Sequence, residues 1–322
     1  FKQKTAYEIM PSLVGSEMCI RDSVFPDPVN TPSEGETLLK ELAASGRYSL
    51  IIALGPELED ALSAAAKEYP GQNFAMLDGI VTEENVYSAS FRTEQAAFVA
   101  GVFAAFMADN LTGYVGILGS VESDPRVQNM IEGFIEGVET AAEREGLNAE
   151  VLTPKYVGSY NDTFTAGNLT YDLFVQEEAA VVFAPVRASI TGVRLGMLEA
   201  NHSLQALYNM THSKKYDRPP LVIAAEGDQD YYGLPNPEIE SGASWIPISV
   251  VPRTDLAAYY VINATLWQDF PRAEHAVYDI FNGGVNITDF TYSTYISEYI
   301  RSQTWDYYRA VVNGTIVIKA GQ

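Results

Sequence analysis

Polar side chains follow the apolar runs that we interpret as buried strands, and their types and placement could support binding chemistry. Asp78 comes directly after the run at 74–77, and Glu226 and Asp228 follow the run at 221–225. Because ligands of parallel sheets bind outside the carboxyl ends of the strands, these carboxylates are candidates for accepting N–H or O–H groups. Asp78 could alternatively serve as a turn residue. Asp228 could equally belong to a turn, a ligand clamp or a metal site, but its surroundings lack the spacing of a calcium loop.

Two further candidates stand where a strand is predicted to end and where a helix is predicted to begin. Phe183 ends the apolar run at 179–183, where its ring could stack on a flat ligand, an interaction worth about 1–3 kcal/mol for a base on an aromatic ring. The alternative is that Phe183 fills the core. Asp255 lies at the start of a predicted helix, where it could hold a ligand hydroxyl or cap the helix. A closed site that excludes water strengthens such polar contacts.

Catalytic signatures are missing from the sequence. It contains no phosphate-binding loop, no dinucleotide-binding glycine turn, no paired-histidine zinc motif and no nucleophile elbow. The three histidines, His202, His212 and His275, stand in segments that we interpret as surface. We therefore predict a binding protein rather than an enzyme, with no catalytic residues, no cofactor and no metal.

The chain is strongly acidic, with 20 Lys and Arg against 42 Asp and Glu and a net charge of −22. Phosphate binding needs clusters of basic residues, so a nucleic-acid partner is excluded. The sequence contains no run of 18 apolar residues, so no membrane span is predicted. Eight of the 15 asparagines begin an N-x-S/T sequon, where chance gives about two. This excess favours a glycosylated protein outside the cell.

The first 23 residues have a different origin in our interpretation. The string SLVGSEMCIRDS at 12–23 looks like a translated adapter from DNA library preparation. A signal peptide is the alternative, but charged and polar residues interrupt the apolar run that it needs. We therefore exclude residues 1–23, and with them Cys19, the only cysteine. We expect the natural N-terminus, including any signal or lipid anchor, to be missing.

The rest of the chain alternates short apolar runs with longer amphipathic segments, which is typical of parallel sheets flanked by helices. Strands are predicted at 49–54, 74–77, 114–118, 150–157, 179–183, 221–225 and 246–251. Helices are predicted at 57–68, 93–108, 125–144, 163–175, 188–200, 255–267 and 297–312. The polar segment 201–220 is interpreted as a surface loop. The sequence therefore predicts an α/β protein built from two similar units.

Eight segments resemble the basic membrane protein family of substrate-binding lipoproteins, which includes purine-nucleoside receptors. They are AKEYPGQNFAMLDG (66–79), NVYSASFRTEQAAFVAGVFAAFMA (85–108), GYVGILGSVESDPRVQNMIEGFIEGV (113–138), KYVGSYNDTFTA (155–166), AAVVFAP (179–185), IAAEGDQDYYG (223–233), FNGGV (281–285) and NGTIVI (313–318). Their order and spacing, over nearly all of residues 40–318, carry the resemblance.

This resemblance implies a periplasmic-binding-protein type I fold, in which two lobes are joined by a three-strand hinge and close on a ligand. Each lobe would be a parallel sheet flanked by helices. We expect lobe 1 at 24–111 plus 248–275 and lobe 2 at 112–247 plus 276–322. The family's first strand and helix, which belong to lobe 1, are expected to be missing with the N-terminus.

The resemblance also implies an ABC-type uptake system, with a purine nucleoside as ligand and a membrane permease as partner. In this family a base lies between aromatic rings and carboxylates hold the ribose. Carried over, Asp78 would contact the base, Phe183 would be one stacking ring and Asp255 would hold the ribose. The protein would lie at the cell surface or in the periplasm, attached to the membrane only through the missing anchor.

Several residues depart from the family pattern near the expected cleft. Ala224 and Glu226 replace a glycine and an aspartate, Phe281 replaces a lysine, and the segment 184–193 replaces a glycine-rich loop. Purine nucleoside is therefore the family's default ligand rather than an interpretation of this site. Two alternatives stay open: the ligand-binding ectodomain of a membrane receptor, and a nucleoside-processing enzyme.

Overall fold

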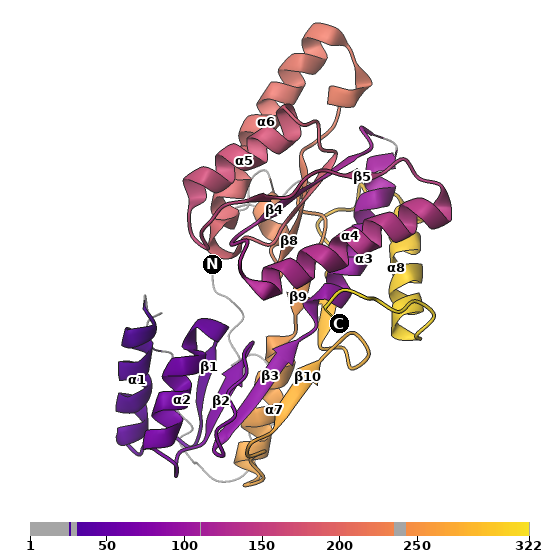
Figure 1. Cartoon of the computed structure of the whole chain (residues 1–322). Helices are drawn as coiled ribbons and strands as arrows, with labels where there is room; N and C mark the ends of the chain where they lie inside the picture. The colour runs from indigo at the N-terminus through magenta and orange to yellow at the C-terminus, as the bar shows by residue number, and fades with distance from the viewer. Residues whose placement is uncertain (1–25, 27–30, 110, 235–242, 322) are drawn as a thin grey trace.

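The structure, a computed structural model, describes residues 26, 31–109, 111–234 and 243–321. The segment 1–23, interpreted as adapter-derived, lies outside the described residues, as does the sequon at Asn110. The described chain forms two sheets with helices on both faces of each (Figure 1). The predicted α/β class with two units is thereby confirmed.

The smaller unit is a parallel four-stranded sheet in the order β1-β2-β3-β10. Its strands are β1 (Ile51–Leu54), β2 (Phe74–Leu77), β3 (Val86–Phe91) and β10 (His275–Tyr278). The helices α1 (Pro32–Ala44) and α2 (Glu59–Glu68) share one apolar cluster with the sheet. The helix α7 (Thr254–Leu266) shares another, with alternate residues of the same strands. This alternation places α7 on the opposite face from α1 and α2.

The β1 strand lies at one edge of this sheet, hydrogen-bonded to β2. Ile52 and Leu54 are 37% and 58% exposed, whereas Ile51 and Ala53 are buried. In the register, Ile52 is paired with Ala75 and Leu54 with Leu77. The two exposed side chains therefore lie on the face that α7 covers farther along the sheet.

The larger unit is a seven-stranded sheet in the order β11-β9-β8-β7-β4-β5, with β6 also paired to β4. Its strands are β4 (Tyr114–Gly119), β5 (Glu150–Val151), β6 (Lys155–Tyr156), β7 (Val181–Ala184), β8 (Leu221–Ala225), β9 (Ser249–Pro252) and β11 (Val285–Ile287). All pairs are parallel except β9 with β11.

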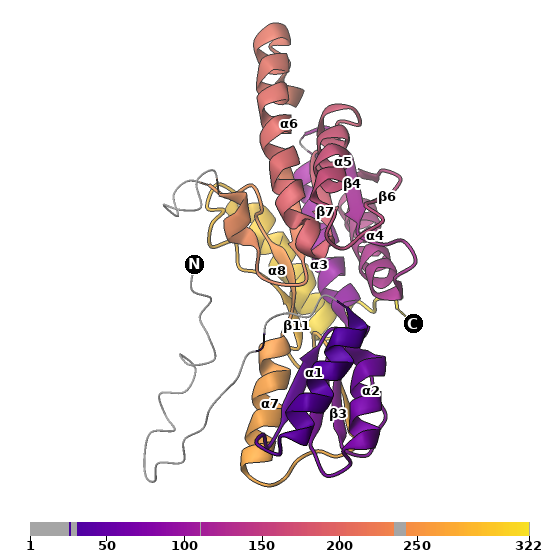
Figure 2. The ribbon, with the colours of Figure 1, turned by 90° about the vertical axis from the view of Figure 1, so that its left-hand side faces the viewer.

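Two layers of helices cover this larger sheet. One apolar cluster joins it to α3 (Thr93–Asp109), α4 (Pro125–Glu145) and α8 (Glu298–Val312). A second cluster joins the other face to α5 (Thr163–Val175) and α6 (Ile190–Thr211). Figure 2 shows α6 extending away from the smaller unit.

The helix α3 is buried on nearly all sides, as its apolar composition predicts. It packs against α4 through glycines. A methyl group added at Gly137 would lie 2.0 Å from the carbonyl oxygen of Phe98, and one at Gly101 would lie 2.1 Å from that of Phe134. The predicted lobe division puts α3 in lobe 1, whereas these contacts are with the larger unit. The lobe boundaries themselves stay a prediction.

The prediction of a loop at 201–220 is wrong over its first half, because α6 continues to Thr211. Val193, Met197, Ala200 and Leu204 are all buried. Their spacing keeps one apolar stripe against the sheet across the predicted boundary. The helix ends at His212 in the left-handed conformation.

Within the described residues, the chain passes between the two units three times: from β3 to α3, from β9 to α7 and from β10 to β11. Backbone hydrogen bonds join these passages side by side. The amide of Arg92 donates to the carbonyl oxygen of Tyr278 over 2.8 Å, and that of Arg253 donates to Gly284 over 2.8 Å. The units are thus linked by three laterally bonded segments.

Candidate functional site

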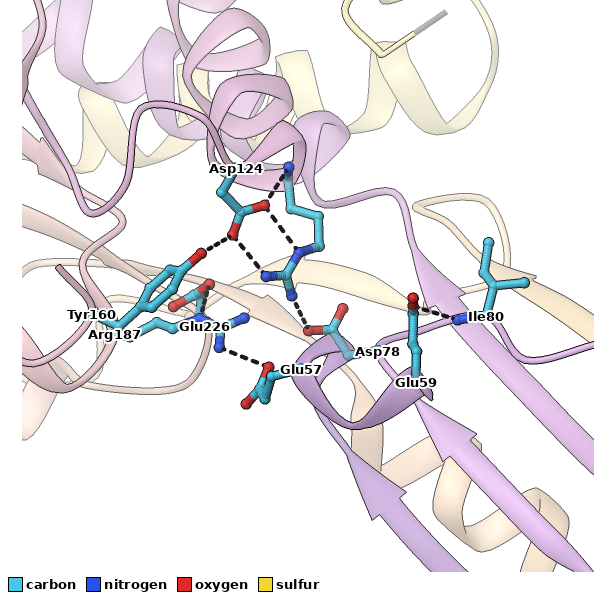
Figure 3. A network of polar contacts seen from close by, with 9 residues as sticks. Glu57, Glu59, Asp78, Ile80, Asp124, Tyr160, Arg187 and Glu226 are labelled. Atoms are coloured by element: carbon cyan, nitrogen blue, oxygen red, sulfur yellow. Dashed lines mark hydrogen bonds and ion pairs between the residues drawn. The ribbon is translucent and has the colours of Figure 1, made fainter. Parts of the chain in front are cut away.

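Seven polar side chains meet where the strand ends of the two units face each other (Figure 3). We call this group the inter-unit network. Its members are Glu57 and Asp78 of the smaller unit and Asp124, Arg126, Tyr160, Arg187 and Glu226 of the larger unit. Each lies one to seven residues after the carboxyl end of a strand, the region where open parallel sheets bind ligands.

Arg126 forms the first bridge between the units. Its Nη1 atom lies 3.2 Å from Oδ2 of Asp78, across the junction. Its Nη2 atom lies 2.7 Å from Oδ2 of Asp124, in its own unit. Asp124 is also the N-cap of α4, where its side chain accepts the backbone N–H of Arg126 over 2.9 Å. This capping hydrogen bond holds Asp124 in the position from which it binds Arg126.

Arg187 forms the second bridge. Its Nε donates to Oε1 of Glu226 over 3.2 Å, and its Nη1 donates across the junction to Oε2 of Glu57 over 3.4 Å. The guanidinium carbon lies 4.9 Å from the centre of the Tyr160 ring, within cation–π range. The Tyr160 hydroxyl donates to Oδ2 of Asp124 over 2.8 Å. The two bridges therefore form one connected network.

Three members of the network have left-handed backbones. The φ angles of Asp78, Arg187 and Glu226 are 60°, 51° and 68°. This conformation costs roughly 1–2 kcal/mol for a residue with a Cβ atom, and it gathers at functional sites. Each of the three directly follows or lies near the end of a central strand, so the sharp turn aims its side chain at the junction.

The carboxylates of the network differ in charge environment. Burial raises the pKa of Asp78, although the charges of Arg126 and Arg187 oppose that effect. Burial likewise raises the pKa of Glu226 against the influence of Arg187. Burial also disfavours the charge of Asp124, but hydrogen bonds from Arg126 and Tyr160 outweigh it and lower its pKa. The lowered pKa of Asp124 favours its ionised form.

One buried oxygen of the network has no hydrogen-bond partner among the described residues. The Oε2 atom of Glu226 is buried and accepts no hydrogen bond, whereas Oε1 is bound by Arg187. A buried acceptor left unpaired costs about 1–3 kcal/mol. A donor from a bound molecule would recover that cost.

The six predicted site residues lie in different surroundings in the structure. Asp78 and Glu226 lie in the network, on opposite units. Ala224 is buried inside β8, two residues before Glu226. Phe183 lies in the core of the larger unit, where its fully buried ring stacks on Phe134 with centroids 4.4 Å apart. The ring faces α4 instead of the junction, which corresponds to the core-filling alternative.

The other two predicted residues are engaged locally. Oδ1 of Asp228 accepts the backbone N–H of Asp230 over 3.2 Å, a turn interaction. Asp255 lies in the first turn of α7 and forms an ion pair of 2.8 Å with Arg253, the N-cap residue. A hydrogen bond from Arg253 is the main cause that lowers the pKa of Asp255.

Sequence reasoning missed five members of the network: Glu57, Asp124, Arg126, Tyr160 and Arg187. A signal was present for Glu57, Tyr160 and Arg187, which lie three or four residues after the strands predicted at 49–54, 150–157 and 179–183. Asp124 and Arg126 lie farther from the strand predicted at 114–118, where the next helix begins. The sequence could not indicate that Arg126 and Arg187 each form ion pairs with carboxylates of both units.

Over the described residues, no group of three His, Cys, Asp or Glu side chains could hold a metal ion. In the same part of the chain, no helix combines the length and apolar character needed to cross a membrane.

One parallel and one mostly parallel sheet, linked by three passages and facing each other with their strand ends, define a periplasmic-binding-protein type I fold. Solved structures agree. A solute-binding protein of an ABC transporter system from Aeropyrum pernix K1 matches with a TM-score of 0.69 at 19% identity, over 91% of this chain and 83% of that one. One from Conexibacter woesei matches with a TM-score of 0.64 at 15% identity, over 90% and 85% of the two chains.

The family model described as ABC transporter substrate-binding protein PnrA-like matches residues 23–320, and the chain belongs to this family. The ABC transporter nucleoside-binding protein BmpA of Lactococcus lactis is 24% identical over 74% of this chain. Basic membrane protein D of Borreliella burgdorferi is 28% identical over 66% of it. An uncharacterized lipoprotein of Pyrococcus furiosus is 30% identical over 70% of it. The matches cover 63%, 62% and 51% of those relatives' own lengths.

Proposed function

We propose that this protein is the solute-binding component of an ABC-type uptake system and that it holds a purine nucleoside between its two units. The observation that carries the proposal is the buried, unpaired Oε2 of Glu226 at a strand end facing the smaller unit. Asp78 lies on the other side of the junction. A ligand that reaches both would be gripped by both units at once.

The chemistry of these groups favours a ligand with several hydrogen-bond donors. The network joins four carboxylates to only two arginines, so an anionic ligand would meet excess negative charge. A nucleoside is neutral and offers ribose hydroxyls together with donors on the base. The name of the Lactococcus relative, a nucleoside-binding protein, supports the same ligand class.

The remaining parts of the proposal follow from family membership. A membrane permease would receive the ligand, and the protein would act at the cell surface or in the periplasm, held by a lipid anchor. The two lobes would be drawn at 24–111 plus 248–275 and at 112–247 plus 276–322. A binding role without turnover agrees with the family's description, an ABC transporter substrate-binding protein, and with the name of the Lactococcus relative.

The first test is ligand-dependent stability of the purified protein across a panel of nucleosides. A ligand that binds only the folded state stabilises it by about 2.7 kcal/mol at a hundredfold excess over Kd. We expect purine nucleosides to raise the melting temperature. The substitution Glu226→Gln turns an acceptor into a potential donor at the unpaired position, so it should abolish most of the shift.

The matched control is Glu139→Gln, at an exposed position on α4, which should leave the shift intact. A flat response to every nucleoside would remove this ligand class. Release of free base from inosine would instead support the enzyme alternative.

A further inference from the structure

We propose that Arg126 and Arg187 are internal cross-links that hold the two units together when no ligand is bound. The proposal concerns the ligand-free protein, so it stands or falls separately from the nucleoside. It makes the network more than a binding surface: the same side chains would set the resting separation of the units.

The two arginines share one arrangement. Each is rooted in the larger unit and pairs with a carboxylate of that unit, Asp124 or Glu226 respectively. Each then reaches across the junction to a carboxylate of the smaller unit, Asp78 or Glu57. Figure 3 shows the Arg187 guanidinium between Glu226 of the larger unit and Glu57 of the smaller one. Separating the units would therefore break one ion pair of each arginine and leave the other in place.

The two cross-unit pairs differ in strength. The Arg126–Asp78 pair is 3.2 Å long, and each of its side chains is less than one third exposed. The Arg187–Glu57 pair is longer, at 3.4 Å, and Glu57 is 54% exposed. Exposed pairs contribute little and are screened by salt, whereas partly buried pairs are screened less. We therefore expect Arg126 to contribute more than Arg187 to holding the two units together.

The rest of the network holds the arginines in place for this role. The Tyr160 ring lies under the Arg187 guanidinium, and its hydroxyl is fixed by Asp124, which also binds Arg126. Arg187 adopts a left-handed backbone with φ of 51°, an unfavourable conformation that the surroundings must impose. An arginine that served only as solvent-exposed charge would need neither constraint.

These contacts also define what a ligand must replace. Asp78 and Glu226 each have one oxygen occupied by an arginine. A ligand that binds both would compete with a guanidinium for part of each carboxylate. The specificity of the site would then depend on donors that can take over from arginine.

The test is the distance between the units in the ligand-free protein, measured by pulsed electron paramagnetic resonance. Spin labels would be attached at Ala44→Cys on α1 and Ala206→Cys on α6, both exposed positions, in a background of Cys19→Ser. The parent should give a single narrow distance distribution. The double variant Arg126→Gln plus Arg187→Gln should give a broader distribution with a longer mean.

The control is Arg309→Gln, which removes an ion pair with Asp306 within α8 and should reproduce the parent distribution. Circular dichroism verifies that each variant is folded. If the double variant does not fold, Asp78→Asn plus Glu57→Gln removes the same cross-unit pairs from the other side and should give the same broadening.

Varying the salt concentration tests the ion pairs without any substitution. Raising the ionic strength from about 0.01 M to 1 M shortens the screening length from about 30 Å to 3 Å. The labelled parent should shift toward the distribution of the double variant. Identical distributions in the parent and in folded variants that lack both cross-unit pairs would overturn the proposal.

Discussion

At the residue scale, the environment of a carboxylate decides its role more than its place in the sequence. Asp78, Asp228 and Asp255 all follow predicted strands or begin helices, and sequence patterns treat them alike. In the structure the first faces the other unit, the second closes a turn and the third pairs with its neighbour Arg253. The strand-end rule singled out all three residues, but it could not tell these three environments apart.

Asp230 provides a residue-scale prediction on pH. It is buried and is hydrogen-bonded by Ser249 over 2.6 Å, and burial raises its pKa from 3.8 to about 7. The folded protein thus binds a proton that the unfolded chain releases above pH 4. This contribution to stability is complete below about pH 4 and is lost as the pH rises through about 7.

We therefore expect Asp230→Asn to stabilise the protein at pH 8 relative to the parent, by on the order of 1–4 kcal/mol, with a smaller gain at pH 5. Urea unfolding at both pH values measures this difference. The exposed Asp269→Asn is the control. An equal effect of Asp230→Asn at the two pH values would contradict the assignment.

Phe183 gives a prediction about packing. Its ring is fully buried against Phe134, and truncating a buried phenylalanine to alanine costs about 3–5 kcal/mol. We expect Phe183→Ala to lower the free energy of unfolding by that amount, measured by urea denaturation. A variant with the parent's stability but weakened ligand binding would instead support the hypothesis that Phe183 stacks on the ligand.

At the element scale, α3 and α4 approach closely because glycines remove side chains from their contact. Gly137→Ala would place a methyl group 2.0 Å from the Phe98 carbonyl oxygen, which the helices can relieve only by moving apart. Such overpacking costs about 1–3 kcal/mol, and we expect the midpoint of urea unfolding to fall accordingly. Gly71→Ala makes the same change where nothing lies within 4 Å. A smaller loss for Gly137→Ala than for Gly71→Ala would contradict this account.

Most of the larger elements could be predicted from the sequence, because periodicity marks them directly. The strand at 74–77 and the helix at 163–175 match their predicted bounds. The helix α1 and the strand β3 were not predicted. The strands β10 and β11 were missed as well, since each has only three or four residues and no distinct alternation. Their pairing depends on partners far away in the chain, which local patterns do not contain.

At the scale of the whole molecule, the predicted fold is confirmed, but the contacts that join the units could not be predicted. Arg126 and Asp78 are 48 residues apart, and Arg187 and Glu57 are 130 apart. No single-sequence pattern couples such positions. The chain has 42 Asp and Glu residues and a net charge of −22, so the sequence offers many possible ion-pair partners for each arginine. Only the folded structure determines which of them lie within reach.

The three passages between the units also constrain the order in which the protein can fold during synthesis. The outer strand β10 is bonded to β3, although Ser90 and His275 are 185 residues apart. A ribosome must therefore make most of the larger unit before the smaller sheet can gain its last strand. Until then β3 keeps one edge unpaired, an open template for wrong partners. The late arrival of β10 makes the smaller unit the part of the nascent chain that most needs protection.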